Sequence, residues 1–458
     1  MSESFSIQSY LDQHPDMTAL EILTPDMNGM FRVKRIPRDE APTFFEKGLT
    51  GPGTMHLMNS LGDMAITPRV GRLNGDPDRA MKAVPATLTP IPWLASETHQ
   101  VLSTWEELDG QPLPFDPRVV LARALKPLTD MGLKVVAATE LEFYLLEQHD
   151  GDRPKARLGR VGGTALRQHG IQYANSEDMQ ELDPFFEAVR KACEVQNLPA
   201  TTAHLEFSEG QLEINLHHID DVITACDHAV LLKRLIKGVA HEQGMAATFM
   251  AKPWEEHAGN GLHIHVSLYD EQGNNIFADP DSDQTPPMSD KLRHAIGGLQ
   301  ATMAECMAIF APNGSSYKRI RPDHFAPVGV NWGYNHRDLA LRIPVSNAKN
   351  LRIEHRVAGA DANPYLVMAC ILMGLHHGLT QALEPSEMIQ EATLMEGQPV
   401  TLPLYWPQAL ELFDGSKLLP EYLGKNYCTL YSDVRWDECE QYHGRINEVD
   451  LAWYLRSS

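Results

Sequence analysis

Four segments of the chain place ionisable side chains at every second residue, with apolar residues between them. In residues 139–144, Glu140 and Glu142 alternate with Leu141 and Phe143. A period of two puts the polar side chains on one face of a β-strand and the apolar side chains on the other face. The other three segments are residues 204–215, 261–267 and 350–356. The sequence therefore predicts four strands that each combine an apolar face with a face of ionisable groups.

The ionisable faces of these segments are rich in carboxylates and imidazoles. A single strand with two carboxylates on one face is most often a half-exposed strand at the protein surface. Four such strands in one sheet would bring the carboxylates together, and they would repel one another unless cations neutralised them. Oxygen ligands with a single imidazole suit Mg²⁺ or Mn²⁺ better than Zn²⁺. We therefore predict a site for two or three divalent ions, with the candidate ligands Glu140, Glu142, Glu206, Glu213, His263 and Glu354.

Cationic residues gather in the part of the chain that contains the last of these segments. They are Lys318, Arg319, Arg321, Arg337, Arg342, Lys349, Arg352 and Arg356. Guanidinium groups bind carboxylates and phosphates through paired hydrogen bonds, and metal ions beside arginines are typical of phosphoryl transfer from a nucleoside triphosphate. A solvated basic surface is the alternative interpretation. No G-x-x-x-x-G-K-S/T motif occurs in the sequence, which excludes the P-loop class of nucleotide-binding enzymes.

The charge balance limits the partners that the chain can bind. Its formal net charge of -22 argues against a general nucleic-acid binder. No apolar run approaches the ~20 residues of a membrane helix, and the first residues lack the basic and apolar regions of a signal peptide. The six cysteines include no C-x-x-C pair and are expected to be reduced structural thiols. We therefore expect a cytoplasmic protein whose partners include neither membranes nor nucleic acid.

The length and the residue patterns predict an α+β protein of two domains. A chain of 458 residues exceeds the usual size of one domain, and turn-forming residues near position 110 divide it into domains 1–110 and 111–458. The first domain is expected to hold a small mixed sheet, with a flexible glycine-rich loop over residues 48–54. In the second domain, residues 148–175 are expected to form a long loop and residues 436–454 a closing helix.

The segments resemble the motifs of the glutamine synthetase family of ATP-dependent ligases, and the resemblance covers nearly the whole chain. The motifs that carry it are residues 140–143, 206–213, 259–267, 316–319 and 351–356. The resemblance implies a small N-terminal β-grasp-like domain and a large catalytic domain with a curved antiparallel sheet. It also implies ATP as a co-substrate and a homo-oligomer, a double-ring dodecamer whose active sites lie between neighbouring subunits.

The resemblance implies a division of the six candidate metal ligands between two ions. The ion on the side of the acceptor glutamate would be held by Glu142, Glu206 and Glu213. The ion on the ATP phosphates would be held by Glu140, His263 and Glu354.

The same resemblance assigns substrate contacts to further residues. The L-glutamate substrate would be bound by Gly259, Arg319, Arg337 and Arg356. The nucleotide would be bound by His265, Ser267, Arg342, Lys349 and Arg352. The catalytic arginines, which would stabilise the charge of the transferred phosphoryl group and its acceptor, would be Arg319, Arg337 and Arg342.

The chain departs from the ammonia-using members of the family at the amine site. Those members carry a glutamate six residues beyond the arginine of the Y-K-R motif, where this chain has Phe325. An aspartate of their N-terminal domain that helps to bind ammonium has no counterpart in residues 48–54. An aromatic ring suits an alkyl amine better than ammonium, and the expected amine pocket includes Phe325 and His324. Residues 75–79, 85–93 and 332–337 are similar to the γ-glutamylpolyamine synthetase branch.

The sequence therefore favours a ligase that makes a γ-glutamyl amide from L-glutamate, ATP and an organic amine, with putrescine or a similar polyamine as the expected amine. The reaction would pass through γ-glutamyl phosphate. Two alternatives remain open at this point: a glutamine synthetase that uses ammonia, and a non-catalytic relative that binds nucleotide or amine. The presence of all six candidate metal ligands argues against the second alternative.

Overall fold

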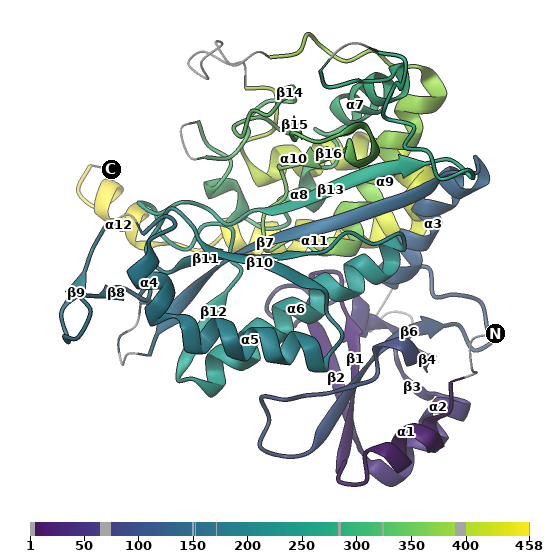
Figure 1. The fold of residues 1–458 in the computed structure, drawn as a ribbon, viewed down its shortest axis with the longest axis vertical. Helices are drawn as coiled ribbons and strands as arrows, with labels where there is room; N and C mark the ends of the chain where they lie inside the picture. The colour runs from purple at the N-terminus through teal and green to yellow at the C-terminus, as the bar shows by residue number, and fades with distance from the viewer. Residues whose placement is uncertain are drawn as a thin grey trace.

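The computed structural model describes residues 5–64, 75–148, 151, 153–170, 172–282, 285–322, 325–389 and 400–457 (Figure 1). Its first sheet has the strand order β2-β1-β6-β4-β3, with β5 paired to β6. β1 and β6 are parallel and the other pairs are antiparallel, as expected for a mixed sheet. The elements of this part are α1 (Ile7–Gln13), β1 (Ala19–Pro25), β2 (Phe31–Pro37), α2 (Ala41–Lys47), β3 (Leu49–Pro52), β4 (Asp78–Ala83), β5 (Thr89–Pro90) and β6 (Thr98–Glu106).

Most of residues 48–54 form the edge strand β3 (Leu49–Pro52), so the expectation of a flexible loop is wrong. β3 pairs with β4, and a short 3-10 helix (Gly53–His56) follows it. Gly48 has a φ of 80°, and a Cβ at Gly51 would lie 3.1 Å from the ring of Trp105. The glycines therefore allow a positive φ and close packing here, rather than flexibility.

The second sheet is larger and runs through the middle of the molecule (Figure 1). Its strand order is β10-β11-β7-β13-β16-β15-β14, with β12 paired to β7. All pairs are antiparallel except β14 and β15, which are parallel, so the predicted antiparallel sheet holds for every other pair. The strands are β7 (Lys134–Glu147), β10 (Ala200–Leu205), β11 (Gln211–Leu216), β12 (Met245–Thr248), β13 (Leu262–Tyr269), β14 (Trp332–Tyr334), β15 (Leu341–Ile343) and β16 (Ile353–His355).

Helices pack around the second sheet. α6 packs against β7 and β12, while α9 packs against α3, α6 and α7. α9 is apolar along most of its length and is almost entirely buried, as expected for a helix that is surrounded by other elements. The helices are α3 (Pro117–Asp130), α4 (Ser176–Glu181), α5 (Asp183–Val195), α6 (Val222–Glu242), α7 (Asp290–Thr302), α8 (Met307–Phe310), α9 (Pro364–Gln381), α10 (Trp406–Gly415), α11 (Lys425–His443) and α12 (Glu448–Tyr454).

Two further expectations about this part of the chain need correction. The expected loop of residues 148–175 contains a small hairpin, β8 (Gly159–Arg160) and β9 (Arg167–Gln168). The expected closing helix of residues 436–454 is two helices, α11 and α12. They separate because Asn447 caps a new helix, accepting hydrogen bonds from the backbone N–H groups of Val449 and Asp450.

One side chain of α6, the helix that packs on β7 and β12 of the second sheet, binds the first sheet. Arg234 forms an ion pair with Glu21 of β1, and its Nε donates to Gln100 of β6 at 3.0 Å.

All six cysteines are buried and free of disulfides. Within the described ranges, no helix has both the length and the apolar character needed to cross a bilayer. The predicted α+β fold is confirmed.

Candidate active site

The register of four neighbouring strands places ionisable residues side by side across the second sheet. Glu213 of β11 pairs with Glu142 of β7, and Glu140 of β7 pairs with His263 of β13. His265 of β13 then pairs with Glu354 of β16. Residues directly opposite each other in an antiparallel pair share a face of the sheet and lie within contact distance. The polar faces predicted from sequence therefore meet on one surface.

His263 lies at the centre of this surface. Its Nδ1 is 3.3 Å from Glu140 Oε2 and 3.9 Å from Glu354 Oε1, and its Nε2 is 3.8 Å from Glu142 Oε1. The surface contains two groups of possible metal ligands, and within each group the ligand atoms lie within 4.8 Å of one another. One group is Glu140, His263 and Glu354, and the other is Glu142, Glu213 and His263. Such carboxylate and imidazole groups could hold metal ions, and oxygen-rich sets favour hard divalent cations.

Glu206 lies beside this surface rather than within either group. It follows the end of β10 and joins a third group through His204, a residue that the sequence reasoning did not assign to the site. His204 Nε2 is 2.7 Å from Glu206 Oε1, and His204 Nδ1 is 3.7 Å from Glu213 Oε1. The two-residue spacing of His204 and Glu206 is the same alternation found elsewhere in the site and was the available signal.

The carboxylates of the cluster perturb one another's ionisation. Burial, followed by the negative charges of Glu140, Glu142 and Glu206, raises the pKa of Glu213 to about 9. Burial alone would also raise the pKa of Glu140, but hydrogen bonds with His263 and His265 lower it well below its usual range. Glu213 thus lies among negative charges that a bound cation would offset. This repulsion and the donor set fit a site that binds divalent metal.

Two arginines neutralise Glu354, whose side chain is fully buried. Arg342 Nη1 lies 2.7 Å from Glu354 Oε2, and Arg356 pairs with Glu354 Oε1. Burial alone would raise the pKa of Glu354, but the charge of Arg356 with those of the neighbouring histidines lowers it to about 2. Arg352, directly before β16, donates from Nε to His265 Nδ1 of β13 at 3.1 Å. The arginines predicted to bind substrate phosphates thus border the metal-ligand groups.

Arg319 is buried beside the same cluster. Its guanidinium donates to the carbonyl oxygens of Val357 at 2.8 Å and Arg356 at 3.3 Å. A Cβ at Gly259 would lie 2.6 Å from Arg319 Cγ, so glycine is required for this close approach. Burial lowers the pKa of Arg319. An anionic group beside this guanidinium would offset the cost of burying it.

The remaining predicted residues lie in different environments. Ser267 is buried on β13, whereas Arg337 and Lys349 are exposed. Phe325 is exposed at 68% and its ring contacts the ring of Phe207. His324 lies outside the described residues.

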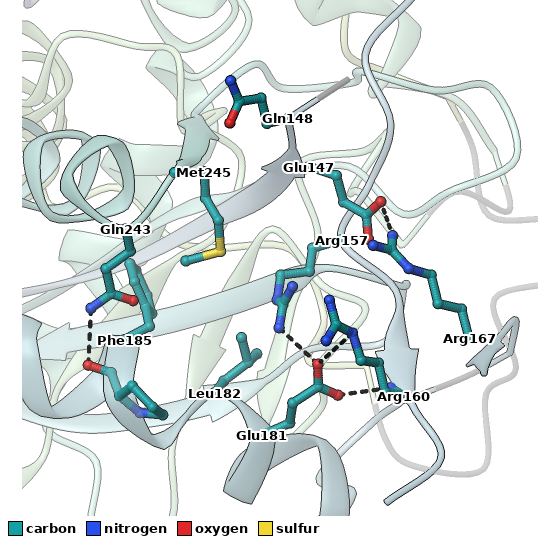
Figure 2. A pocket seen from close by; sticks show the side chains of 12 residues that line it. Glu147, Gln148, Arg157, Arg160, Arg167, Glu181, Leu182, Phe185, Gln243 and Met245 are labelled. Atoms are coloured by element: carbon teal, nitrogen blue, oxygen red, sulfur yellow. Dashed lines mark hydrogen bonds and ion pairs between the residues drawn. The ribbon is translucent and has the colours of Figure 1, made fainter. Parts of the chain in front are cut away.

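A separate cavity of about 380 Å³ lies between the end of β7, the β8–β9 hairpin and α5 (Figure 2). Arginines line it, and Figure 2 shows them directed at two carboxylates: Arg157 and Arg160 pair with Glu181, while Arg167 pairs with Glu147. The residues that line this cavity include none of the predicted site residues. The carboxylate cluster, not this cavity, is therefore the candidate active site.

Comparisons with known proteins agree with the geometry. The family profile described as "Glutamine synthetase, catalytic domain" matches residues 114–454. The chain is 37% identical to gamma-glutamylputrescine synthetase PuuA of Escherichia coli strain K12, over 99% of this chain and 94% of that protein. It is 31% identical to a gamma-glutamylethanolamide synthetase of Streptomyces coelicolor, over 97% and 93% of the two proteins. A solved structure of GmaS without ligand shares the fold, with a TM-score of 0.84 at 23% identity over 98% of this chain and 99% of that chain. The chain therefore belongs to the glutamine synthetase family, as its motifs indicated.

Proposed function

We propose that this protein is an ATP-dependent ligase that joins the γ-carboxylate of L-glutamate to an organic amine. The observation that carries the proposal is the row of carboxylates and imidazoles across β11, β7, β13 and β16, bordered by Arg342, Arg352 and Arg356. Divalent ions and guanidiniums on one surface are suited to phosphoryl transfer between two anions. The γ-phosphoryl group of ATP passes to the glutamate carboxylate, giving ADP and γ-glutamyl phosphate. The amine then displaces phosphate and loses a proton.

The carboxylates hold two or three Mg²⁺ or Mn²⁺ ions in this proposal. One set of ligands is Glu142, Glu206 and Glu213, and the other is Glu140, His263 and Glu354. Ions held by these residues would offset the negative charge of the triphosphate and of the reacting carboxylate, which otherwise repel each other. The raised pKa of Glu213 supports the first set, because a buried carboxylate among three others gains most from a cation.

The arginines and neighbouring groups bind the two anionic substrates. Arg319, Arg356 and the backbone at Gly259 hold glutamate, and the burial of the Arg319 guanidinium supports a partner of opposite charge. Arg337 contacts both glutamate and the phosphoryl group, and its exposure leaves it open to substrate. The nucleotide contacts are His265, Ser267, Arg342, Lys349 and Arg352.

The amine is an alkyl amine rather than ammonia, with putrescine or another polyamine as the best candidate. Phe325 supports this choice because a ring can contact a carbon chain but has no carboxylate that could pair with ammonium and remove its proton. The relatives named for γ-glutamylputrescine and γ-glutamylethanolamide synthesis also support an organic amine. His324 is a further proposed residue of the amine pocket.

An amine panel tests the proposed function. Phosphate release from ATP is measured with glutamate, Mg²⁺ and each of putrescine, spermidine, ethanolamine, an aromatic amine and ammonium. We expect kcat/KM to be much higher for an organic amine than for ammonium, and we expect release to depend on glutamate. Equal kcat/KM for ammonium and the best organic amine would instead identify an ammonia-using glutamine synthetase. No glutamate-dependent release with any amine would identify a binding protein.

We further propose that residues 1–110 and 111–458 are two domains and that copies of the chain form a double-ring dodecamer with shared sites. Apolar side chains at the C-terminal end support an assembly that covers them, since Trp453 is 67% exposed and Leu455 is 79% exposed. Sedimentation of the active enzyme tests this proposal. An active monomer of 51.2 kDa would contradict it.

A further inference from the structure

Two exposed aromatic rings from distant parts of the chain touch, and one of them belongs to the residue that follows Glu206. The ring centroids of Phe207 and Phe325 are 5.1 Å apart, with 46° between the ring planes. Phe207 is 40% exposed and Phe325 is 68% exposed. Large apolar side chains that remain this exposed next to ionic groups are candidates for contact with an apolar part of a ligand.

The turn that carries Phe207 is fixed on both sides. Ser208 Oγ accepts a hydrogen bond from the backbone N–H of Ala258 at 2.7 Å. Gln172 Oε1 accepts from the backbone N–H of Gly210 at 3.2 Å. Gly210 has a φ of +72°, and a Cβ there would lie 2.9 Å from backbone of the neighbouring chain segment. Phe207 therefore projects from a well-supported turn.

Phe325 has a backbone conformation that aromatic residues rarely adopt. Its φ is +55°, in the left-handed region that normally favours glycine. Such strained positions persist where other contacts hold them and are enriched at functional sites. The contact of the Phe325 ring with Phe207 is one such contact.

The position of the ring pair relative to the cluster suggests its ligand. Phe207 directly follows Glu206, and Glu206 shares His204 with Glu213, so the turn that carries Phe207 begins at a residue of the metal-ligand groups. Neither ring can bind metal ions or phosphates through an ionised group. We propose that Phe207 and Phe325 together bind the carbon chain of the acceptor amine, which makes Phe207 a specificity-determining residue. This inference rests on the proposed ligase function.

A series of unbranched monoamines, from methylamine to butylamine, measures the contact directly. Their amino groups are chemically alike, so differences in kcat/KM report the contacts of the carbon chain. Each methylene that the rings remove from water should raise kcat/KM roughly fourfold, which corresponds to ~0.8 kcal/mol per buried CH₂. Because the rings contact carbons that do not react, the gain should appear mainly in KM rather than in kcat.

The experiment compares the full-length enzyme with Phe207→Ala, Phe325→Ala, the double variant and Phe207→Leu. In each alanine variant, we expect kcat/KM to rise less than about twofold per methylene. The double variant should lose less of this dependence on chain length than the two single variants lose together, because the rings contact each other. Phe207→Leu should retain most of the increase in kcat/KM per methylene because it keeps an apolar side chain. Phe5→Ala is the matched control, since Phe5 is 46% exposed and its ring stacks on Phe45 with centroids 5.2 Å apart.

Hydroxylamine separates failure of this inference from failure of the proposed function. It has no carbon chain, yet it can displace phosphate from γ-glutamyl phosphate to give a γ-glutamyl hydroxamate. Normal hydroxamate formation with an unchanged amine series in Phe207→Ala would overturn the role of the rings and leave the ligase proposal intact. An equal loss with hydroxylamine and every amine would also overturn it, by showing that Phe207 only supports the site. If the wild-type enzyme forms neither hydroxamate nor amide, both proposals fall.

Discussion

Replacement of Glu354 by alanine should damage the stability of the protein as well as its activity. The side chain of Glu354 is fully buried, and the two arginines that pair with it are themselves only 12% and 14% exposed. The substitution therefore leaves Arg342 and Arg356 without their shared counter-charge in a site of low water content. Removing one member of a buried ion pair costs about 3–5 kcal/mol, mostly because the remaining charge is left uncompensated.

The expected change in melting temperature follows from the size of the chain. An unfolding entropy of about 2.1 cal/mol/K per residue gives roughly 1 kcal/mol/K for the whole protomer. The loss should therefore lower Tm by about 3–5 °C, if each protomer unfolds in one transition. Differential scanning fluorimetry without added metal measures this shift. Activity should also fall at least roughly 100-fold, since the proposal makes Glu354 a metal ligand.

Two further variants make the prediction specific. Glu411→Ala removes an exposed carboxylate from α10 and should leave both Tm and activity unchanged. Glu354→Ala combined with Arg342→Met should recover part of the lost Tm, because one uncompensated charge is also removed. A Tm for Glu354→Ala equal to that of the wild type would refute the reasoning, since it would show that the buried ion pairs contribute nothing.

Three other predictions concern pH and the exposed arginine. The pKa of Glu354 is lowered to about 2 from an ordinary value of 4.5, so its contribution to stability is present above pH 4.5 and is lost as pH falls toward 2. Glu354→Gln should lack the decline in Tm that protonation of Glu354 causes in the wild type. If Tm fell identically with pH in both proteins, the lowered pKa of Glu354 would be contradicted. Arg337→Ala should keep its Tm within about 1 °C of the wild-type value, because the residue is exposed, yet it should lose activity. An unchanged kcat/KM for ATP and for glutamate would show that Arg337 is not part of the active site. The kcat/KM for an amine with a pKa near 10 should rise up to about tenfold per pH unit above neutrality, because the free base attacks. A flat profile would indicate that the enzyme removes the proton itself.

The residues of the candidate site could be found from sequence because alternation is a local property. Glu140 and Glu142 share a face of β7 whichever strands lie next to it, and the same is true of His263 and His265 on β13. His204 was missed although its two-residue spacing from Glu206 was a local signal. Its place in the site depends also on Glu213 of the neighbouring strand β11, which the sequence does not show.

The errors in the fold arose where the local signal has two readings. Glycines in residues 48–54 were taken as a sign of flexibility, but they allow β3 to pack closely on β4 and on Trp105. Polar composition suggested a continuous loop before α4, although a two-residue strand pair forms there. The break between α11 and α12 depends on one capping residue, Asn447, inside an otherwise helical pattern.

The sequence by itself determined the strands, the family and the chemical nature of the site, because period-two alternation and short motifs need no knowledge of the fold. Tertiary structure decided which groups meet. The strand order β11-β7-β13-β16 sets the cross-strand pairs, places His263 between Glu140, Glu142 and Glu354, and encloses Glu354 between two arginines. The tertiary structure also brings Phe207 into contact with Phe325, more than a hundred residues away in the chain. Burial and charge proximity are properties of this packing, so the ionisation of the cluster could not be read from the order of the residues.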